Sequence, residues 1–331
     1  MANKLIIFEK LEVNRKKPVN FKEEDAYLFQ HEFKKVIPES YLLKLSQPIV
    51  INNSIFDFKN LTFHFKHTFY KSHSNSKLAK DTVKNIVYAK KGIKNLDKGI
   101  WIVDSKSVNF GHWIIDAMCR LMLIPDRYKN YPVLLPSTFN INWIIEIFDY
   151  LKIEYILLEN NQKYKLNELI LTSDAHPSGN FNPDIVKKLR NIFLEKLDKS
   201  NEKKVNRVWA YREHISRAVG NFEQIEKILI KYNFQLVKTE QLNLVEKINL
   251  FKNTEVLAGT HSSGLVNMIF MEKGSKLFEV RDYQDSHKNA LFSLASALGI
   301  DYFYTERSES LIEGDGNIDP IMFEESLKKC L

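Results

Sequence analysis

From residue 99 onward the chain alternates short apolar runs with amphipathic stretches, and this alternation constrains its fold more than any other feature. The apolar runs at 100–104 and 131–136 predict buried strands. Between such runs, apolar residues recur three and four positions apart, as at 142–151 and 222–231, which predicts helices. This alternation is typical of βαβ units around a parallel sheet. We therefore expect an α/β protein.

The domain organisation follows from a polar run, 198–204, that has no hydrophobic period. We place a linker there, which gives an N-terminal domain over 1–200 and a C-terminal domain over 201–331. Within the first domain, 99–200 is expected to be Rossmann-like, and the residues before it form an irregular, β-rich extension (1–98). Two Rossmann-like domains would face each other across a cleft, with ligands at the carboxyl ends of their strands.

The positive charge lies mainly in the extension. The protein has 48 Lys and Arg and 41 Asp and Glu, a net charge of +7. Residues 1–100 hold 19 of these basic and 10 of the acidic residues, which leaves them at +9 and the remainder at −2. Such a segment attracts an anionic acceptor or an acidic lipid surface, although solvated lysines fit equally well. Its lysines are not interleaved with aromatic residues, so no nucleic-acid partner is expected.

Several features predict a cytoplasmic protein. Its two cysteines, Cys119 and Cys330, are too few for a disulfide framework and have no metal-ligand spacing. The apolar run at 5–8 is too short for a signal peptide. The most apolar stretch, 113–125, is interrupted by charged residues and cannot span a bilayer. Any membrane contact would be peripheral, on the inner face.

The first segment with chemical potential, 108–120, follows the strand predicted at 100–104. If the chain is helical from Phe110, then His112, Asp116 and Arg120 are four residues apart and share one face. A carboxylate beside an imidazole can orient it as a general base near neutral pH. The same spacing fits a His–Asp pair that only stabilises the start of the helix.

The second segment, 255–271, reads as a strand, a short polar turn and a helix. Backbone N–H groups at the helix start, with the hydroxyls of Thr260, Ser262 and Ser263, would bind an anion such as a diphosphate. The turn matches neither a Walker loop nor a G-x-G-x-x-G fingerprint. Simple capping of the helix by serine is the alternative.

Further polar residues belong with this second segment. Arg212 and Arg217 follow the strand predicted at 205–211 and can neutralise phosphate. Glu279 ends a predicted strand, where an acidic residue holds a ribose hydroxyl in nucleotide-binding sheets. The chain has no Asp-x-Asp pair for Mg²⁺ or Mn²⁺, so we expect no metal site.

Both segments resemble glycosyltransferase family 61 in order and spacing. The residues that match its Asn-aromatic-x-His-Trp-x-x-Asp-x-x-x-Arg segment are Asn109, Phe110, His112, Trp113, Asp116 and Arg120. The residues that match its glycine-rich segment and continuation are Gly259, His261, Gly264, Leu265, Asn267, Phe270, Met271, Gly274 and Glu279. The family's arginine-rich strand end is similar to Arg212, Arg217, Asn221 and Glu223. Ser262 and Ser263 depart from the family's usual Gly-Ala.

The resemblance implies a two-domain GT-B architecture and inverting transfer of a sugar from a nucleotide-sugar, commonly a UDP-sugar. His112 would act as the base, oriented by Asp116, with Asp116 itself as the alternative base. The turn at 260–264, with Arg212 and Arg217, would stabilise the departing diphosphate in place of a metal, so no cofactor is expected.

Further roles follow from the same resemblance. His261 would hydrogen-bond the phosphates, and Asn267 and Glu279 would hold the nucleoside. The residues expected on the acceptor side or in support of the base are Asn109, Trp113 and Arg120. The helical tail at 319–331 is expected to pack back on the first domain.

By family analogy the acceptor is a glycan or lipid-linked oligosaccharide of a bacterial capsule or lipopolysaccharide. Two alternatives stay open: a non-catalytic nucleotide- or carbohydrate-binding protein of the same fold, and a transferase that uses a CMP- or GDP-sugar. A hydrolase is disfavoured, because the nucleophile elbow requires G-x-S-x-G and the turn at 259–264 lacks it.

Overall fold

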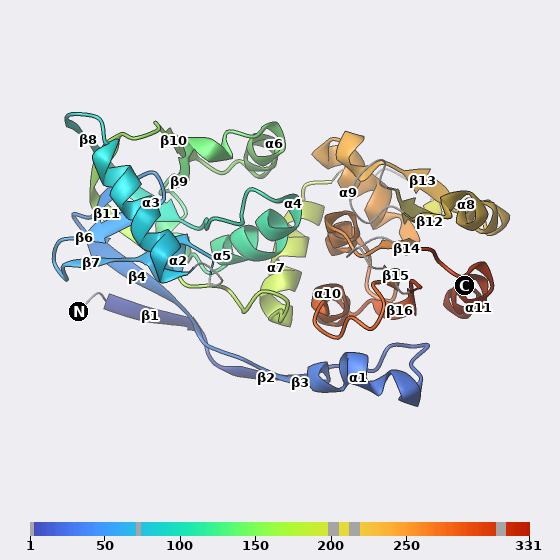
Figure 1. Ribbon diagram of the computed structural model, residues 1–331. Helices are drawn as coiled ribbons and strands as arrows, with labels where there is room; N and C mark the ends of the chain where they lie inside the picture. Colours follow the sequence, from blue (N-terminus) through green and yellow to red (C-terminus); the bar gives the residue numbers. More distant parts are fainter. Residues whose placement is uncertain (1–2, 71–73, 198–204, 212–218, 309–315) are drawn as a thin grey trace. The chain divides into compact units, whose positions relative to one another are not determined.

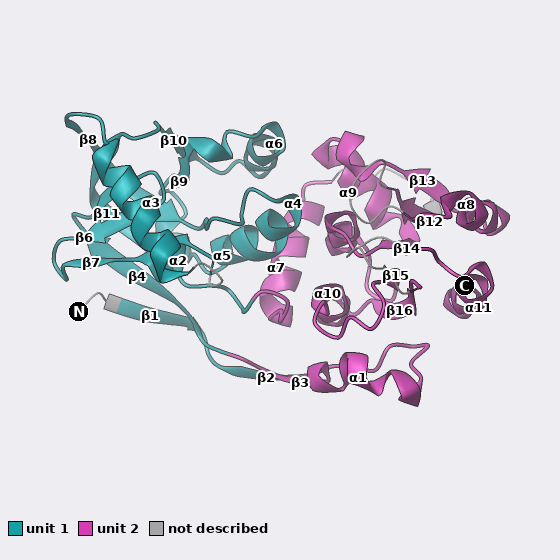
Figure 2. Ribbon diagram, viewed as in Figure 1, with its two compact units in different colours: residues 1–11, 38–177 teal, residues 12–37, 178–331 magenta. Residues whose placement is uncertain are grey.

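A computed structural model describes residues 3–70, 74–197, 205–211, 219–308 and 316–331. The chain forms two compact units, shown in separate colours in Figure 2. Unit 1 consists of Met1–Leu11 and Pro38–Pro177, and unit 2 of residues 12–37 and Ser178–Leu331. The structure is therefore mixed α/β, as the alternation predicts, but each unit draws on two separate stretches of the chain.

Unit 1 is built on a mixed sheet of nine strands (Figure 1). The four parallel strands are β8 (Ile93–Trp101), β9 (Val133–Pro136), β10 (Tyr155–Leu158) and β11 (Lys163–Thr172). The antiparallel strands are β1 (Asn3–Phe8), β4 (Ser40–Ser46), β5 (Ile49–Ile51), β6 (Ser54–Asp57) and β7 (Thr62–Phe63). Strand β11 joins the two sets. One of its edges pairs parallel with β8, and the other pairs antiparallel with both β4 and β5. The expected extension is thus part of the same sheet as the βαβ strands.

The helices of unit 1 include those predicted after residue 99 and two that the sequence pattern did not predict, α2 and α3. The bounds are α2 (Phe65–Thr68), α3 (Asn75–Val87), α4 (Phe110–His112), α5 (Met118–Leu121) and α6 (Asn142–Leu151), with 3₁₀ turns at Asp126–Tyr128 and Ser137–Phe139. A π-helical turn, Trp113–Ala117, connects α4 to α5. Helix α3 is capped by the Ser74 hydroxyl, which accepts from the Lys77 N–H.

Unit 2 contains a five-stranded, fully parallel sheet in the order β13-β12-β14-β15-β16. The bounds are β12 (Val205–Ala210), β13 (Gln235–Val237), β14 (Thr254–Thr260), β15 (Lys276–Arg281) and β16 (Asp301–Glu306). Counted within the unit, this order is 2-1-3-4-5, which is that of a doubly wound sheet. The order reverses between β12 and β14, so sheets of this kind bind ligands at the carboxyl ends of these two strands.

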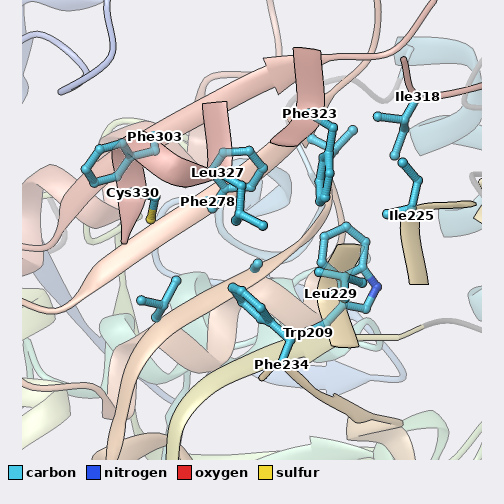
Figure 3. Packing of buried hydrophobic residues seen from close by; sticks show 13 residues of the cluster. Trp209, Ile225, Leu229, Phe234, Phe278, Phe303, Ile318, Phe323, Leu327 and Cys330 are labelled. Carbon is cyan, nitrogen blue, oxygen red and sulfur yellow. The ribbon is translucent and has the colours of Figure 1, made fainter. Parts of the chain in front are cut away.

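Helices cover both faces of this sheet. The bounds are α7 (Pro183–Leu194), α8 (Phe222–Lys231), α9 (Leu244–Lys252), α10 (Ala290–Leu298), α11 (Pro320–Cys330) and the 3₁₀ helix η7 (Ser263–Phe270). On one face, Phe323 and Leu327 of α11 pack with Trp209, Phe278 and their neighbours in the core shown in Figure 3. Helix α11 therefore packs on its own unit rather than on the first domain, because its apolar face is complementary to this sheet.

The unit boundaries differ from the expected domains at α7 and in the N-terminal region. Helix α7 belongs to unit 2, where the ring of Phe193 contacts that of Phe270 at 5.3 Å between centroids. The division therefore falls at 177/178 instead of in the polar run at 198–204, which lies outside the described residues.

Residues 12–37 form an arm that packs on unit 2 although it precedes most of unit 1 in the sequence. The arm holds β2 (Leu11–Asn14), α1 (Ala26–Phe29) and β3 (Lys34–Ile37), flanked by 3₁₀ turns at Glu23–Asp25 and Gln30–Glu32. Phe29 makes edge contacts with Phe292 and Tyr304, with ring centroids 5.3 and 4.8 Å apart. The ring of Phe29 is fully buried, and burial of an aromatic ring stabilises a fold strongly. The arm is therefore part of the hydrophobic core of unit 2.

Within the described ranges, no helix has both the length and the apolar character that a membrane crossing requires.

Candidate functional site

In unit 1, His112 and Asp116 form a close pair at the start of the helical segment that follows β8. The Nδ1 atom of His112 lies 2.6 Å from Oδ2 of Asp116, and the two side chains are 29% and 16% exposed. A carboxylate only accepts, so Nδ1 donates to Asp116, and in the neutral form of the ring the lone pair lies on Nε2. Among the described residues, Nε2 hydrogen-bonds to no other side chain. This nitrogen is suited to take a proton from a hydroxyl.

The π turn at Trp113–Ala117 sets the geometry of this pair. Asn109 begins the helix by accepting from the Gly111 N–H at 2.9 Å, which fixes the residue immediately before His112. Inside the turn, the carbonyl of Ile115 accepts a hydrogen bond from His176 Nε2 at 2.8 Å. Burial lowers the pKa of His176, so its ring is a neutral donor to this carbonyl. π turns inside helices occur frequently at functional sites.

Arg120 does not share the face of His112 and Asp116, in contrast to the expectation. The π turn inserts one residue between them, which rotates Arg120 into the core, where it is 3% exposed. Its guanidinium donates to the hydroxyl and carbonyl of Thr172 at 2.9 and 2.8 Å, and to the His67 carbonyl at 2.8 Å. Arg120 therefore ties the helix to the end of β11.

Trp113 also has a supporting position. Its side chain is fully buried, and its ring contacts Phe139, Trp143 and Phe148 at centroid distances of 5.5 to 6.0 Å. An indole enclosed by other aromatic rings has no face left for a sugar. Of the three acceptor-side candidates, only Asn109 lies at the surface.

In unit 2, the turn after β14 lies at the reversal of strand order, close to the end of β12. Glycine at 259 and 264 permits this approach. A Cβ at Gly259 would lie 3.2 Å from the Ala210 carbonyl, and one at Gly264 would lie 3.3 Å from the Thr239 hydroxyl. The turn therefore packs closely against its neighbours, as glycine-bearing strand-to-helix turns do in nucleotide-binding sheets.

The side chains of this turn leave polar atoms available. Ser262 precedes η7 but makes no capping hydrogen bond, so the alternative of simple serine capping fails. Its Oγ is buried and has no partner among the described residues. Asn267 donates to the Gly264 carbonyl at 2.8 Å, while its buried Oδ1 has no partner in the described part of the chain. Unpartnered buried polar atoms are costly, and a ligand would offset that cost.

A chain of hydrogen bonds through Glu279 connects the turn after β14 to the neighbouring strands. Its Oε1 is paired with His261 Nδ1, and its Oε2 accepts from the Tyr302 hydroxyl at 2.6 Å. Tyr302 in turn accepts from Arg281 at 3.0 Å. The sequence pattern did not single out Tyr302 or Arg281, because nothing in local spacing marks a hydrogen bond between residues on neighbouring strands.

Burial changes the role expected for Glu279. The side chain is fully buried, and both carboxylate oxygens are occupied, so it has no surface to offer a ribose. Burial acts to raise the pKa of Glu279, but the pairing with His261 and the charge of Arg281 outweigh it and hold the pKa below the ordinary value. Glu279 is therefore an ionised group that orients His261.

Other predicted residues are placed as follows. Thr260, at the end of β14, is buried and pairs with Val280, while Ser263 begins η7 and is half-buried. Arg212 and Arg217 lie outside the described residues. The described ranges contain no group of three His, Cys, Asp or Glu side chains that could hold a metal ion.

Both segments of the candidate site lie within a match to one known protein family. Residues 110–278, just over half of the chain, match the model of the family described as Glycosyltransferase 61. This range includes both the His112–Asp116 pair and the turn after β14. The chain belongs to glycosyltransferase family 61.

A curated relative is similar over a shorter stretch. The EGF domain-specific O-linked N-acetylglucosamine transferase of Drosophila melanogaster is 28% identical over 90 residues. That stretch is 27% of this chain and 17% of the relative, so the chain aligns with a small part of that protein.

Replacing Glu279 with Gln tests its role as a buried ion. We expect Glu279→Gln to lower the free energy of unfolding by about 1–3 kcal/mol at pH 7, because His261 and Tyr302 lose a charged acceptor. A carboxyl with a depressed folded pKa stabilises the protein above its ordinary value of 4.5, and this contribution disappears as the pH falls through the folded pKa. The difference between the two proteins should therefore narrow in acid.

Urea unfolding at several pH values between neutral and acid measures this difference. The exposed Glu325→Gln serves as the control and should match the wild type throughout. A constant difference at every pH would contradict an ionised Glu279.

Proposed function

We propose that the protein is an inverting glycosyltransferase that moves a sugar from a nucleotide-sugar, with UDP as the nucleotide, to a hydroxyl of a surface glycan. The observation that carries the proposal is the His112–Asp116 pair, in which the carboxylate fixes the tautomer and leaves Nε2 to accept a proton. The unpartnered Oγ of Ser262 and Oδ1 of Asn267, which follow β14, would supply contacts to the donor. In the terms of the GT-B architecture, unit 1 supplies the base and unit 2 holds the donor.

The chemistry at the base is a single displacement. Nε2 of His112 takes the proton of the acceptor hydroxyl as its oxygen bonds to the anomeric carbon. The bond from that carbon to the diphosphate breaks on the opposite face, so the configuration inverts. Asp116 stabilises the imidazolium that results, in the way a buried carboxylate supports histidine in other enzymes. With His112 absent, Asp116 would be the alternative base.

The departing diphosphate requires positive partners. Backbone N–H groups at the start of η7, the Ser262 hydroxyl and the His261 ring would hydrogen-bond its oxygens. Arg212 and Arg217 would add charge in bidentate contacts. These groups take over the role that Mg²⁺ or Mn²⁺ plays elsewhere, so we propose that transfer requires no metal. Asn267, through its unpartnered Oδ1, would contact the nucleoside.

The donor class can be measured without knowledge of the acceptor. We expect micromolar binding of UDP, unchanged by EDTA, in calorimetric titrations with UDP, GDP, CMP and ADP. His261→Ala should weaken binding about tenfold or more, because it removes a hydrogen bond to a charged group. The exposed His287→Ala is the matched control. Tighter binding of GDP or CMP than of UDP would identify a different donor nucleotide. Nucleotide binding that requires Mn²⁺ would contradict the proposal that no metal is needed.

Turnover separates an enzyme from a binding protein of the same fold. Since the relative is named as an N-acetylglucosamine transferase, nucleotide-linked N-acetylglucosamine is the first donor to assay. We expect His112→Ala and Asp116→Ala to lower kcat by about 10²–10⁴-fold while nucleotide affinity stays unchanged. Asp126→Ala, whose side chain is 91% exposed in the same unit, is the control. Near-normal turnover of both variants would refute the base assignment.

We also propose that helix α3 contacts an anionic membrane surface. Its buried residues are polar, Thr82 and Asn85, whereas Val83, Ile86 and Val87 are 57–68% exposed. Lys77 and Lys80 lie exposed beside this apolar face. A helix with an outward apolar face and flanking lysines is typical of binding in the interface of acidic lipids. Such contact would place the enzyme beside a lipid-linked acceptor.

Vesicle co-sedimentation tests the membrane contact. We expect binding to vesicles that contain phosphatidylglycerol and little binding to pure phosphatidylcholine. Lys77→Gln and Lys80→Gln should each reduce the free energy of vesicle binding by about 1 kcal/mol, which is roughly a fivefold loss of affinity. The double variant Ile86→Ser with Val87→Ser should weaken vesicle binding further. Val245→Ser, at an exposed position on α9, is the control. Equal binding of all variants would exclude α3 as the contact.

A further inference from the structure

Unit 1 contains a cavity of about 550 Å³ that is separate from the His112–Asp116 pair. Its lining residues come from the ends of β8 and β9, from α3 and from the turn between β5 and β6. The size is within the range of small-molecule pockets, roughly 300–1,000 Å³. Part of its wall comes from α3 and the β5–β6 turn, which precede the family segment at 110–278.

The cavity wall is rich in amide groups. Asn85 of α3, which is 7% exposed, accepts from Asn52 at 2.8 Å and donates to Asn53 at 3.1 Å. Asn52 also donates to Asn161 at 3.0 Å. These bonds hold the amides in fixed positions, so the polar wall is preorganised.

Several polar groups of the wall are not used by the protein itself. The hydroxyl of Thr68 is fully buried and has no partner among the described residues. The carboxylate of Asp81 and the ammonium of Lys84 also make no hydrogen bond or ion pair with any described residue. A buried hydroxyl without a partner is costly, and a ligand hydroxyl would satisfy it.

The chemistry of the wall selects the ligand. Amides, two carboxylates, one ammonium and hydroxyls can donate to and accept from several hydroxyl groups at once. The carboxylate of Asp104 already accepts from the N–H groups of Lys106 and Ser107 and from the Ser107 hydroxyl. The charged groups left open to a ligand are therefore the Asp81 carboxylate and the Lys84 ammonium, which balance each other. A neutral saccharide matches this balance of charge and the density of hydrogen-bonding groups. The exposed ring of Tyr88 adds a surface on which a sugar can stack.

The cavity is linked to the candidate base through two residues. Ser105 lines the cavity, and its hydroxyl accepts from the Tyr70 N–H at 3.1 Å. The Tyr70 ring lies against His112, with centroids 6.0 Å apart. Asp104 and Val108, on the same loop, line the cavity immediately before Asn109. A glycan chain could thus have one unit in the cavity and a later unit at His112.

We propose that this cavity binds a neutral sugar unit of the acceptor that does not itself react. The inference rests on the proposed function, because the linkage to His112 has meaning only for a transferase. Contacts to a remote sugar would supply binding energy that positions the reacting hydroxyl and set which glycans are extended.

Saturation-transfer NMR tests the proposal without turnover. The probes are the methyl β-glycosides of glucose, galactose and N-acetylglucosamine, together with lactose and diacetylchitobiose, at millimolar concentrations. We expect at least one to bind the wild type. Lys84→Ala and Tyr88→Ala should each weaken it, Lys84→Ala by about tenfold through loss of a charged donor. The matched controls are Lys187→Ala and Tyr283→Ala, exposed residues of unit 2 that lie outside the cavity.

Two outcomes would overturn the proposal: no saturation transfer to any probe, or equal binding by the cavity variants and their controls. UDP titration of the same samples separates this inference from the proposed function. Intact UDP binding without glycoside binding would refute the cavity alone. Glycoside binding that depends on Lys84 and Tyr88, without UDP binding, would support the cavity and refute the proposed donor.

Discussion

The buried carboxylate of Glu279 is the constraint on which the second unit depends. An ion taken out of water costs several kcal/mol unless it is paired and hydrogen-bonded, so its position dictates its neighbours. His261 comes from the turn after β14 and Tyr302 from β16, while Arg281 lies two residues along β15. These bonds connect β15 to β16 and to the turn that follows β14. The ring of His261, and with it the turn after β14, is thereby held in one position.

Each unit uses a histidine held by a carboxylate, with different exposure. In unit 1 the carboxylate of Asp116 is 16% exposed and its partner ring 29%, so solvent and a substrate hydroxyl can reach the pair. In unit 2 the carboxylate is fully buried and its partner ring is 17% exposed. The first pair is therefore open to solvent. In the second, pairing with His261 and the charge of Arg281 hold the pKa of Glu279 below its ordinary value, so this carboxylate stays ionised.

Regular periodicity allowed much of the fold to be predicted. The predicted helices at 142–151 and 222–231 coincide with α6 and α8, and the strand predicted at 131–136 contains β9. Helix α3 was not predicted, because its exposed face is apolar and its buried face carries Thr82 and Asn85, the reverse of the usual pattern. The first hundred residues therefore gave little signal of how they join the sheet.

The site was predictable where it depends on local spacing and not where it depends on packing. A separation of four residues brings His112 and Asp116 together, and the structure confirms that contact. The same rule failed for Arg120, because one extra residue in a helical turn leaves no mark in the sequence. Glu279 was predicted to end a strand, but it lies inside β15 (Lys276–Arg281), and its oxygen Oε2 is bonded by Tyr302, 23 residues further along.

The arm formed by residues 12–37 affects how the protein can be divided. The chain passes between the units at 11/12, at 37/38 and at 177/178, so neither unit is a continuous stretch of sequence. A fragment that begins at 178 would lack Phe29, and the rings of Phe292, Tyr302 and Tyr304 that contact it would face solvent. Expression of the second unit alone, or its exchange between related proteins, would succeed only if the arm were carried with it.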